Sequence, residues 1–125
     1  MKNSSLLGRI SIAWNGIKVF AKQCENFKIH ASAAVGAITL GFILEIGRTD
    51  WLIILTAIAL VFITEMINEA VEILCNHLHP DQHSSIGKVK DIAAGAVLIA
   101  SIFSLIVGIY IYLPGILNQF KVWFN

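Results

Sequence analysis

Charge is scarce in this sequence: only 14% of its 125 residues are Asp, Glu, Lys or Arg, about half of the usual share. Apolar residues make up 57% of the chain, and the mean hydropathy is +0.77. A soluble domain of this size could not bury so much apolar surface. The sequence therefore predicts one integral-membrane domain over residues 1–125.

Other absences exclude whole classes of function. The net charge is only +1, so no basic surface attracts nucleic acid. The two cysteines, Cys24 and Cys75, match no metal-binding or redox spacing and are expected to be free thiols. No glycine-rich phosphate loop is present, which excludes a P-loop and a protein-kinase site. No signal peptide is expected, because no compact apolar segment precedes a small-residue cleavage site.

Long apolar runs are what the sequence does contain. They predict three membrane-spanning helices, at about residues 29–47, 51–78 and 91–113. The second should end before Pro80, and the third should begin at an N-cap on Asp91 and end at Pro114. Residues 5–26 are apolar mainly on one side, which predicts a helix on the membrane surface. The expected fold is all-α: an amphipathic surface helix plus three transmembrane helices.

The basic residues predict the orientation of the chain in the membrane. Seven of the nine precede the first span or lie between the second and third: Lys2, Arg9, Lys18, Lys22, Lys28, Lys88 and Lys90. Only Arg48 and Lys121 lie on the other side. This bias places the N-terminus and the connection Asn76–Asp91 in the cytoplasm.

A stripe of polar residues interrupts the second span. At about 100° per residue, one helix face carries Glu65, Asn68, Glu69, Glu72, Asn76 and His79. A charged residue at the centre of a membrane helix costs roughly 2.5–3.5 kcal/mol, so these carboxylates call for a function. Glu65 lies about 21 Å along the helix from Trp51 and Glu72 about 31 Å, so the stripe ends at the depth of lipid headgroups.

Four interpretations of this stripe compete. It could be a helix end in water, which suits Glu72 but suits Glu65 poorly, or it could line an ion path or hold an oligomer together. The fourth interpretation is catalysis. Basic side chains expected on the same membrane side are Lys18, Lys22, His83, Lys88 and Lys90. Carboxylates beside cations suit a magnesium nucleotide, and phosphoryl transfer to a lipid hydroxyl suits this depth.

Three segments carry a more specific signal. They are Glu65–Glu72 (EMINEAVE), Lys90–Leu98 (KDIAAGAVL) with His83 before it, and Glu25–His30 (ENFKIH). Over about residues 10–110 the chain resembles the prokaryotic diacylglycerol kinase and undecaprenol kinase family. The resemblance implies a homotrimeric lipid kinase of the bacterial inner (plasma) membrane, with active sites shared between subunits and ATP and Mg²⁺ as co-substrate and cofactor. Either diacylglycerol or undecaprenol could be its lipid. The alternative is a non-enzymatic membrane oligomer or channel.

The resemblance also implies roles for individual residues. Glu65 is the general base toward the lipid hydroxyl, and Asn68 orients the reacting groups. Glu72 binds the metal and the nucleotide, with Glu69 as a further metal ligand. The nucleotide also contacts His83, Lys90 and Asp91, and the lipid contacts Glu65, Asn26, Lys28, His30 and Ala94.

The chain departs from the family pattern at three positions. Cys24 stands where the family has a metal-binding glutamate, and Glu25 beside it would point about 100° away on a regular helix. Glu69 replaces a small Ser or Thr, and Asn76 replaces a frequent aspartate. Either Glu69 compensates for Cys24, or the chain is a weakened or specialised member.

Overall fold

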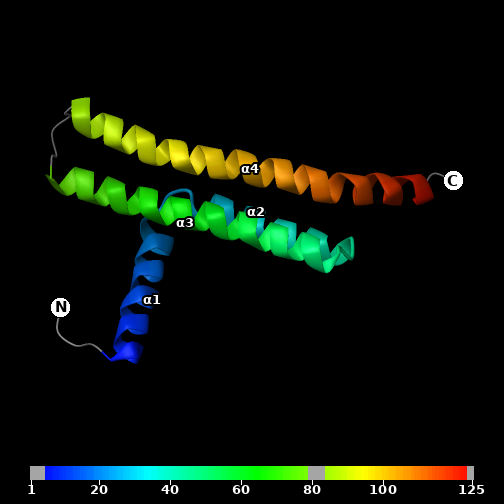
Figure 1. The fold of residues 1–125 in the computed structure, drawn as a ribbon, viewed down its shortest axis with the longest axis horizontal. Coiled ribbons are helices and arrows are strands. Elements are labelled where there is room, and N and C mark those ends of the chain that lie inside the picture. The colour runs from blue at the N-terminus through cyan, green and yellow to red at the C-terminus, as the bar shows by residue number, and fades with distance from the viewer. Residues whose placement is uncertain (1–4, 79–83, 124–125) are drawn as a thin grey trace.

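The computed structural model describes residues 5–78 and 84–123, with side chains described as far as Gln119. Within these ranges the structure consists of helices and short turns, without a strand. The helices are α1 (Leu6–Gln23), α2 (Phe27–Ile43), α3 (Arg48–Leu78) and α4 (Ser84–Trp123). The helices α3 and α4 lie side by side, α2 runs along α3, and α1 crosses the direction of the other three (Figure 1).

The first helix is mostly exposed. The Ser5 side chain caps it by accepting a hydrogen bond from the Gly8 amide at 3.3 Å, and Phe20 is its only buried residue. Apolar side chains such as Leu7, Ile10 and Trp14 are exposed. The helix ends at Gln23, so the expected end at residue 26 is wrong: the Cys24 N–H bonds back to the Phe20 carbonyl and the chain then turns.

The second helix is apolar but only 17 residues long. It ends at Ile43 rather than at residue 47, because Glu45 adopts a left-handed φ of 51°. The amides of Glu45 and Ile46 return to the carbonyls of Phe42 and Gly41, the hydrogen-bond pattern of a Schellman cap. This cap turns the chain sharply into α3.

The long helices α3 and α4 are both apolar and long enough to cross a membrane. At about 1.5 Å per residue, α3 measures about 46 Å, more than the roughly 30 Å of bilayer hydrocarbon. Two side-chain hydrogen bonds tie α4 to its neighbours: the Ser104 hydroxyl donates to the Ala57 carbonyl of α3 at 3.1 Å, and the Tyr112 hydroxyl donates to the Ala37 carbonyl of α2 at 2.7 Å.

The helix that contains the expected last span extends beyond residues 91–113 at both ends, so the expected N-cap at Asp91 and the expected helix end at Pro114 are wrong. The helix begins at Ser84 instead of Asp91, because serines suit a helix start and Lys90, near this start, contacts Glu72 and Asn76 of α3. It also continues through Pro114. Proline removes one backbone donor, but helices can tolerate this loss where neighbouring helices support them, and Leu44 packs close to Gly115 here. Lys90 therefore lies on α4 and not in a loop.

Candidate active site

Glu65 is the only buried charged side chain in the described parts of the chain, with 1% of its surface exposed. Three residues around the α1–α2 turn approach its carboxylate, and we call the four residues the Glu65 cluster. His30 Nε2 lies 2.7 Å from Oε1, Asn26 Nδ2 donates to Oε1 at 3.4 Å, and the Cys24 thiol donates to Oε2 at 3.8 Å. Such partners offset the cost of burying a carboxylate.

An aromatic contact holds the α1–α2 turn against α3. Phe20 of α1, Phe27 of α2 and Phe62 of α3 meet edge to face, with ring centroids 5.5–6.5 Å apart. Phe62 lies one helical turn before Glu65, so the aromatic rings and the carboxylate share one face of α3. The three rings therefore position the turn that carries Cys24 and Asn26 over Glu65.

The carboxylate opens onto a pocket of about 330 Å³, which we call the Glu65 pocket. Its lining residues come from the start of α2, the middle of α3 and α4: Asn26, Ile29, His30, Glu65, Asn68, Ala94, Val97, Leu98 and Ser101. Five of them are residues that the sequence assigned to catalysis or lipid binding. The structure thus brings together positions that lie far apart in the chain.

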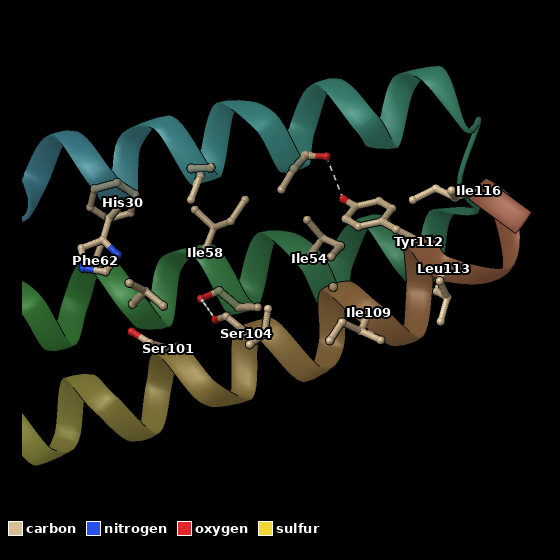
Figure 2. A pocket seen from close by; sticks show the side chains of 17 residues that line it. His30, Ile54, Ile58, Phe62, Ser101, Ser104, Ile109, Tyr112, Leu113 and Ile116 are labelled. Atoms are coloured by element: carbon tan, nitrogen blue, oxygen red, sulfur yellow. Dashed lines mark hydrogen bonds between the residues drawn. The ribbon is translucent and has the colours of Figure 1, made fainter.

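A second, larger pocket lies between α2, α3 and α4, and we call it the apolar pocket. It has a volume of about 540 Å³ and is lined mainly by aliphatic side chains and small residues, among them Ala37, Ala57 and Gly108. His30 and Ser101 line both pockets. Figure 2 shows these two residues at one end of the apolar pocket and Tyr112 and Leu113 at the other. The apolar pocket and the Glu65 pocket therefore lie next to each other.

The remaining acidic residues of the stripe lie further along α3. Glu69 and Glu72 are half-buried, and Lys90 Nζ lies 3.1 Å from a carboxylate oxygen of Glu72 and 3.1 Å from Asn76 Oδ1. The stripe thus passes from a buried carboxylate to an exposed amide, which argues against a simple helix end in water.

A magnesium ion suits the oxygen atoms of Glu69 and Glu72, which are neighbours at i and i+3 on α3 and can supply the one or two carboxylates that Mg²⁺ uses beside phosphate oxygens. Within residues 5–78 and 84–119, no group of three or more His, Cys, Asp or Glu residues is arranged so that it could hold a metal ion by itself. A magnesium ion held by Glu69 and Glu72 would need further ligands from outside this group, such as phosphate or water oxygens.

The Cys24 thiol is a poor candidate for this ion. Burial raises the pKa of the Cys24 thiol above its usual value, and the negative charges of Glu65 and Glu69 raise it further. The group therefore stays protonated near neutral pH and donates to Glu65. A protonated sulfur does not suit a hard cation such as Mg²⁺. Cys75, also buried, is a free thiol as expected.

Other predicted residues lie apart from the two pockets or outside the described residues. Lys28 and Asp91 are exposed and line neither pocket. Cys24 and Glu25 lie beyond the end of α1, so the angle between them is not that of a regular helix. Their side chains nevertheless differ in exposure, because Cys24 is buried and Glu25 is exposed. His79 and His83 lie outside the described residues, so their predicted roles stay predictions.

Sequence reasoning missed the part played by α4. The sequence alone gives no role to Ser101 or Ser104, but Ser101 lines both pockets and the Ser104 hydroxyl donates a hydrogen bond to α3. The spacing of Ala94, Ser101 and Gly108 was the available signal, because residues seven apart share a helix face. This face of α4 forms one wall of both pockets.

Comparison with known proteins gives consistent matches. The sequence model of a family described as prokaryotic diacylglycerol kinase matches residues 11–112. An undecaprenol kinase of Bacillus subtilis is 38% identical over 103 residues, which cover 82% of this chain and 83% of that protein. A diacylglycerol kinase of Synechocystis sp. is 34% identical over 116 residues, or 91% of this chain and 66% of that protein. A diacylglycerol kinase of Escherichia coli is 26% identical over 94 residues, or 75% and 77%.

Proposed function

Because the chain belongs to the prokaryotic diacylglycerol kinase family, a family of lipid kinases, we propose that it transfers the γ-phosphoryl group of ATP to the primary hydroxyl of undecaprenol or diacylglycerol. The products would be undecaprenyl phosphate or phosphatidic acid. The matches give no support to the alternative of a channel or a purely structural oligomer, since each matched protein is named as a kinase.

One observation carries this proposal: the apolar pocket meets the Glu65 pocket at His30 and Ser101. A lipid alcohol has the same two parts, a hydrocarbon chain and a hydroxyl at its end. The pocket residues on α4 run from Ser101 to Ile116, which is about 22 Å at about 1.5 Å per residue. One lipid chain lying along this face would present its hydroxyl to the Glu65 cluster.

The chemistry required of the protein is limited. In phosphoryl transfer, catalysis is mostly positioning and stabilisation of charge, with a base to accept the proton of the attacking hydroxyl. The Glu65 cluster supplies the base, and Asn68, in the same pocket, orients the reacting groups. Lys90, held beside Glu72, can balance phosphate charge, and Asp91 and His83 are proposed nucleotide contacts. Lys28 is a proposed contact to the lipid headgroup.

Glu72 and Glu69 would hold the magnesium ion, because they offer the oxygen ligands that it prefers. When bound, the ion would neutralise part of the phosphate charge. Glu69 would then be the second carboxylate ligand in place of Cys24, whose protonated thiol does not suit Mg²⁺. This role would account for the additional carboxylate at position 69.

We further propose an inner-membrane protein with three spans, in which α2 is the first span, α1 lies on the surface, and the N-terminus is cytoplasmic. A homotrimer with shared active sites fits two features. Large apolar side chains of α4, such as Ile99, Leu105 and Tyr110, are exposed in the single chain. Glu69 and Glu72 are also only half-buried in the single chain, so a neighbouring subunit could approach them.

The test is a substrate panel with purified protein in mixed micelles and radiolabelled ATP. Undecaprenol, diacylglycerol, a long-chain alkane without a hydroxyl, and no lipid are compared with and without Mg²⁺. We expect label transfer only to a lipid alcohol and only with Mg²⁺. Absence of lipid-dependent transfer under all conditions would reject the proposal in favour of a non-enzymatic oligomer.

A further inference from the structure

The hydroxyl groups that line the apolar pocket belong to Ser101, Ser104 and Tyr112 of α4. The Ser104 and Tyr112 hydroxyls donate to backbone carbonyls of α3 and α2, at 3.1 Å and 2.7 Å (Figure 2). The Ser101 hydroxyl has no hydrogen-bond partner within residues 5–78 and 84–119. Ser101 therefore carries the pocket hydroxyl whose proton is available to a bound lipid.

The Ser101 hydroxyl also makes no bond to its own helix. Serine and threonine side chains inside helices can donate to the carbonyl of the residue four positions earlier, and Ser32, Thr56 and Thr64 do so at 2.7–2.9 Å. Ser101 instead lines both the apolar pocket and the Glu65 pocket. A hydroxyl without a partner is unfavourable in an apolar wall, so we expect a bound lipid to offer it an acceptor.

The position of Ser101 relative to Glu65 follows from the packing of α3 against α4. The two helices are antiparallel, and the hydrogen bond from Ser104 to the Ala57 carbonyl fixes how they lie beside each other (Figure 1). Counted from this bond toward the end of α3, Glu65 is eight residues along α3 and Ser101 is three residues along α4, a difference of about 7 Å at about 1.5 Å per residue. Side chains lean toward the N-terminus of their own helix, so these two lean toward each other. The Ser101 hydroxyl and the Glu65 carboxylate are thus a few ångströms apart along the path proposed for the lipid.

Other polar side chains at this place are already engaged or lie elsewhere. Of the two residues that line both pockets, His30 contacts Glu65 through Nε2 at 2.7 Å. Asn26 also donates to Glu65, at 3.4 Å, and Asn68 lines the Glu65 pocket but not the apolar pocket. Ser101 is therefore the donor that a polar atom of the lipid, next to its reacting hydroxyl, would meet.

The two candidate lipids differ at this separation from the hydroxyl. In diacylglycerol, the carbon atom next to the hydroxyl-bearing carbon carries an ester, whose carbonyl oxygen accepts hydrogen bonds. In undecaprenol, the same stretch is hydrocarbon and offers no acceptor. We propose that the Ser101 hydroxyl donates to this ester carbonyl oxygen while Glu65 acts on the reacting hydroxyl; this inference rests on the proposed function. Ser101 is then a specificity-determining residue that favours diacylglycerol over a polyprenol.

The test combines a variant of the protein with a matched change in the lipid. Ser101→Ala removes the hydroxyl, and a dialkylglycerol keeps the chain lengths of diacylglycerol but has ether oxygens in place of the esters. With diacylglycerol, we expect kcat/KM of Ser101→Ala to fall by about three- to tenfold, the factor that corresponds to one neutral hydrogen bond. With dialkylglycerol or undecaprenol, kcat/KM should stay within about twofold of the wild type, and the KM for ATP should not change.

Ser104→Ala is the matched control. Ser104 also lines the apolar pocket on α4, but its hydroxyl is already bonded to the Ala57 carbonyl. Any change in this variant should therefore be the same for all three lipids. The wild-type protein provides a second measurement that needs no variant, since it should use diacylglycerol better than dialkylglycerol.

The outcomes separate this inference from the proposed function. If Ser101→Ala loses the same factor with diacylglycerol and dialkylglycerol, or loses nothing with either, Ser101 does not contact the ester and the inference is wrong, while the lipid kinase stands. Wild-type activity with undecaprenol but not with diacylglycerol would overturn it as well. A wild-type protein without lipid-dependent ADP release would instead overturn the proposed function.

Discussion

The Glu65 pocket and the apolar pocket share two residues but differ in how their lining side chains interact. In the Glu65 pocket, a single buried carboxylate has specific partners at 2.7, 3.4 and 3.8 Å. In the apolar pocket, mainly aliphatic and small side chains from three helices surround a volume of about 540 Å³, and most of these side chains are apolar. Directional contacts have few substitutes, whereas apolar packing tolerates exchange of side chains of similar volume. Substitutions should therefore affect turnover at one end and lipid affinity at the other.

The largest effect is expected for Glu65→Gln. The amide keeps the size of the side chain but removes the negative charge on which proton transfer to the cluster depends, so kcat should fall by about 10²–10⁴-fold. The measurement is label transfer in mixed micelles, and size-exclusion elution should match the wild type. Near-normal turnover would contradict a catalytic role for Glu65 and would favour a role of the polar stripe in assembly or conduction.

A smaller effect is expected in the apolar pocket, for Gly108→Leu. A Cβ at Gly108 would meet only Tyr112, at 4.0 Å, so the backbone accepts a side chain that then fills part of the apolar pocket. Each buried methylene of a lipid chain is worth about 0.8 kcal/mol, so displacing two should raise the KM for lipid roughly tenfold. The KM for ATP should not change.

Gly36→Leu is the matched control for this variant. A Cβ at Gly36 meets nothing within 4 Å, and Gly36 lines neither pocket. Equal changes in both variants would contradict lipid binding in the apolar pocket. Loss of the oligomer in Gly108→Leu alone would indicate that a helix of a second copy occupies it.

Cys24→Glu tests the magnesium site, because it places an additional carboxylate oxygen near Glu69. We expect the magnesium concentration for half-maximal activity to fall several-fold, because Mg²⁺ prefers carboxylates to a protonated thiol. Without the ion, the new carboxylate lies near Glu65 and Glu69 and is repelled by them, so Mg²⁺ should raise the melting temperature of the variant more than that of the wild type.

Glu25→Gln serves as the comparison for Cys24→Glu, because Glu25 is exposed and should change the magnesium dependence little. A severe loss in Glu25→Gln, with no gain in Cys24→Glu, would show that Glu25 is the second ligand instead. If neither variant responds to magnesium, the second ligand lies elsewhere.

The smallest effect is expected for Tyr112→Phe, which removes the hydrogen bond to the Ala37 carbonyl at the end of the apolar pocket away from His30 (Figure 2). Hydrogen bonds between membrane helices average about 0.6 kcal/mol and reach about 1.7 kcal/mol, so unfolding should become easier by an amount in this range. Equilibrium unfolding in mixed detergent measures it. Tyr110→Phe, at a side chain that is 82% exposed, should change nothing measurable. An equal loss in both variants would mean that the hydrogen bond contributes no stability.

Much of the candidate site could be predicted from the sequence because it depends on helical spacing. Glu65 and Asn68 share a face of α3 on any regular helix, and the apolar run before them predicts that this helix is long. The motif resemblance added Asn26, His30 and Ala94, and all three line the Glu65 pocket. The end of α4 was not predictable in this way, because the effect of Pro114 depends on what packs against it.

The sequence by itself determined the all-helical, apolar character of the chain and the polar stripe on its longest apolar run, since composition and periodicity are local properties. Only the tertiary structure decided that the Cys24 thiol donates to Glu65, that His30 contacts the carboxylate and lines both pockets, and that Ser101 lines both pockets as well. These contacts join residues 35 or more positions apart. They depend on how the α1–α2 turn and α4 pack onto α3, and helical periodicity within one segment carries no information about which faces of different helices meet.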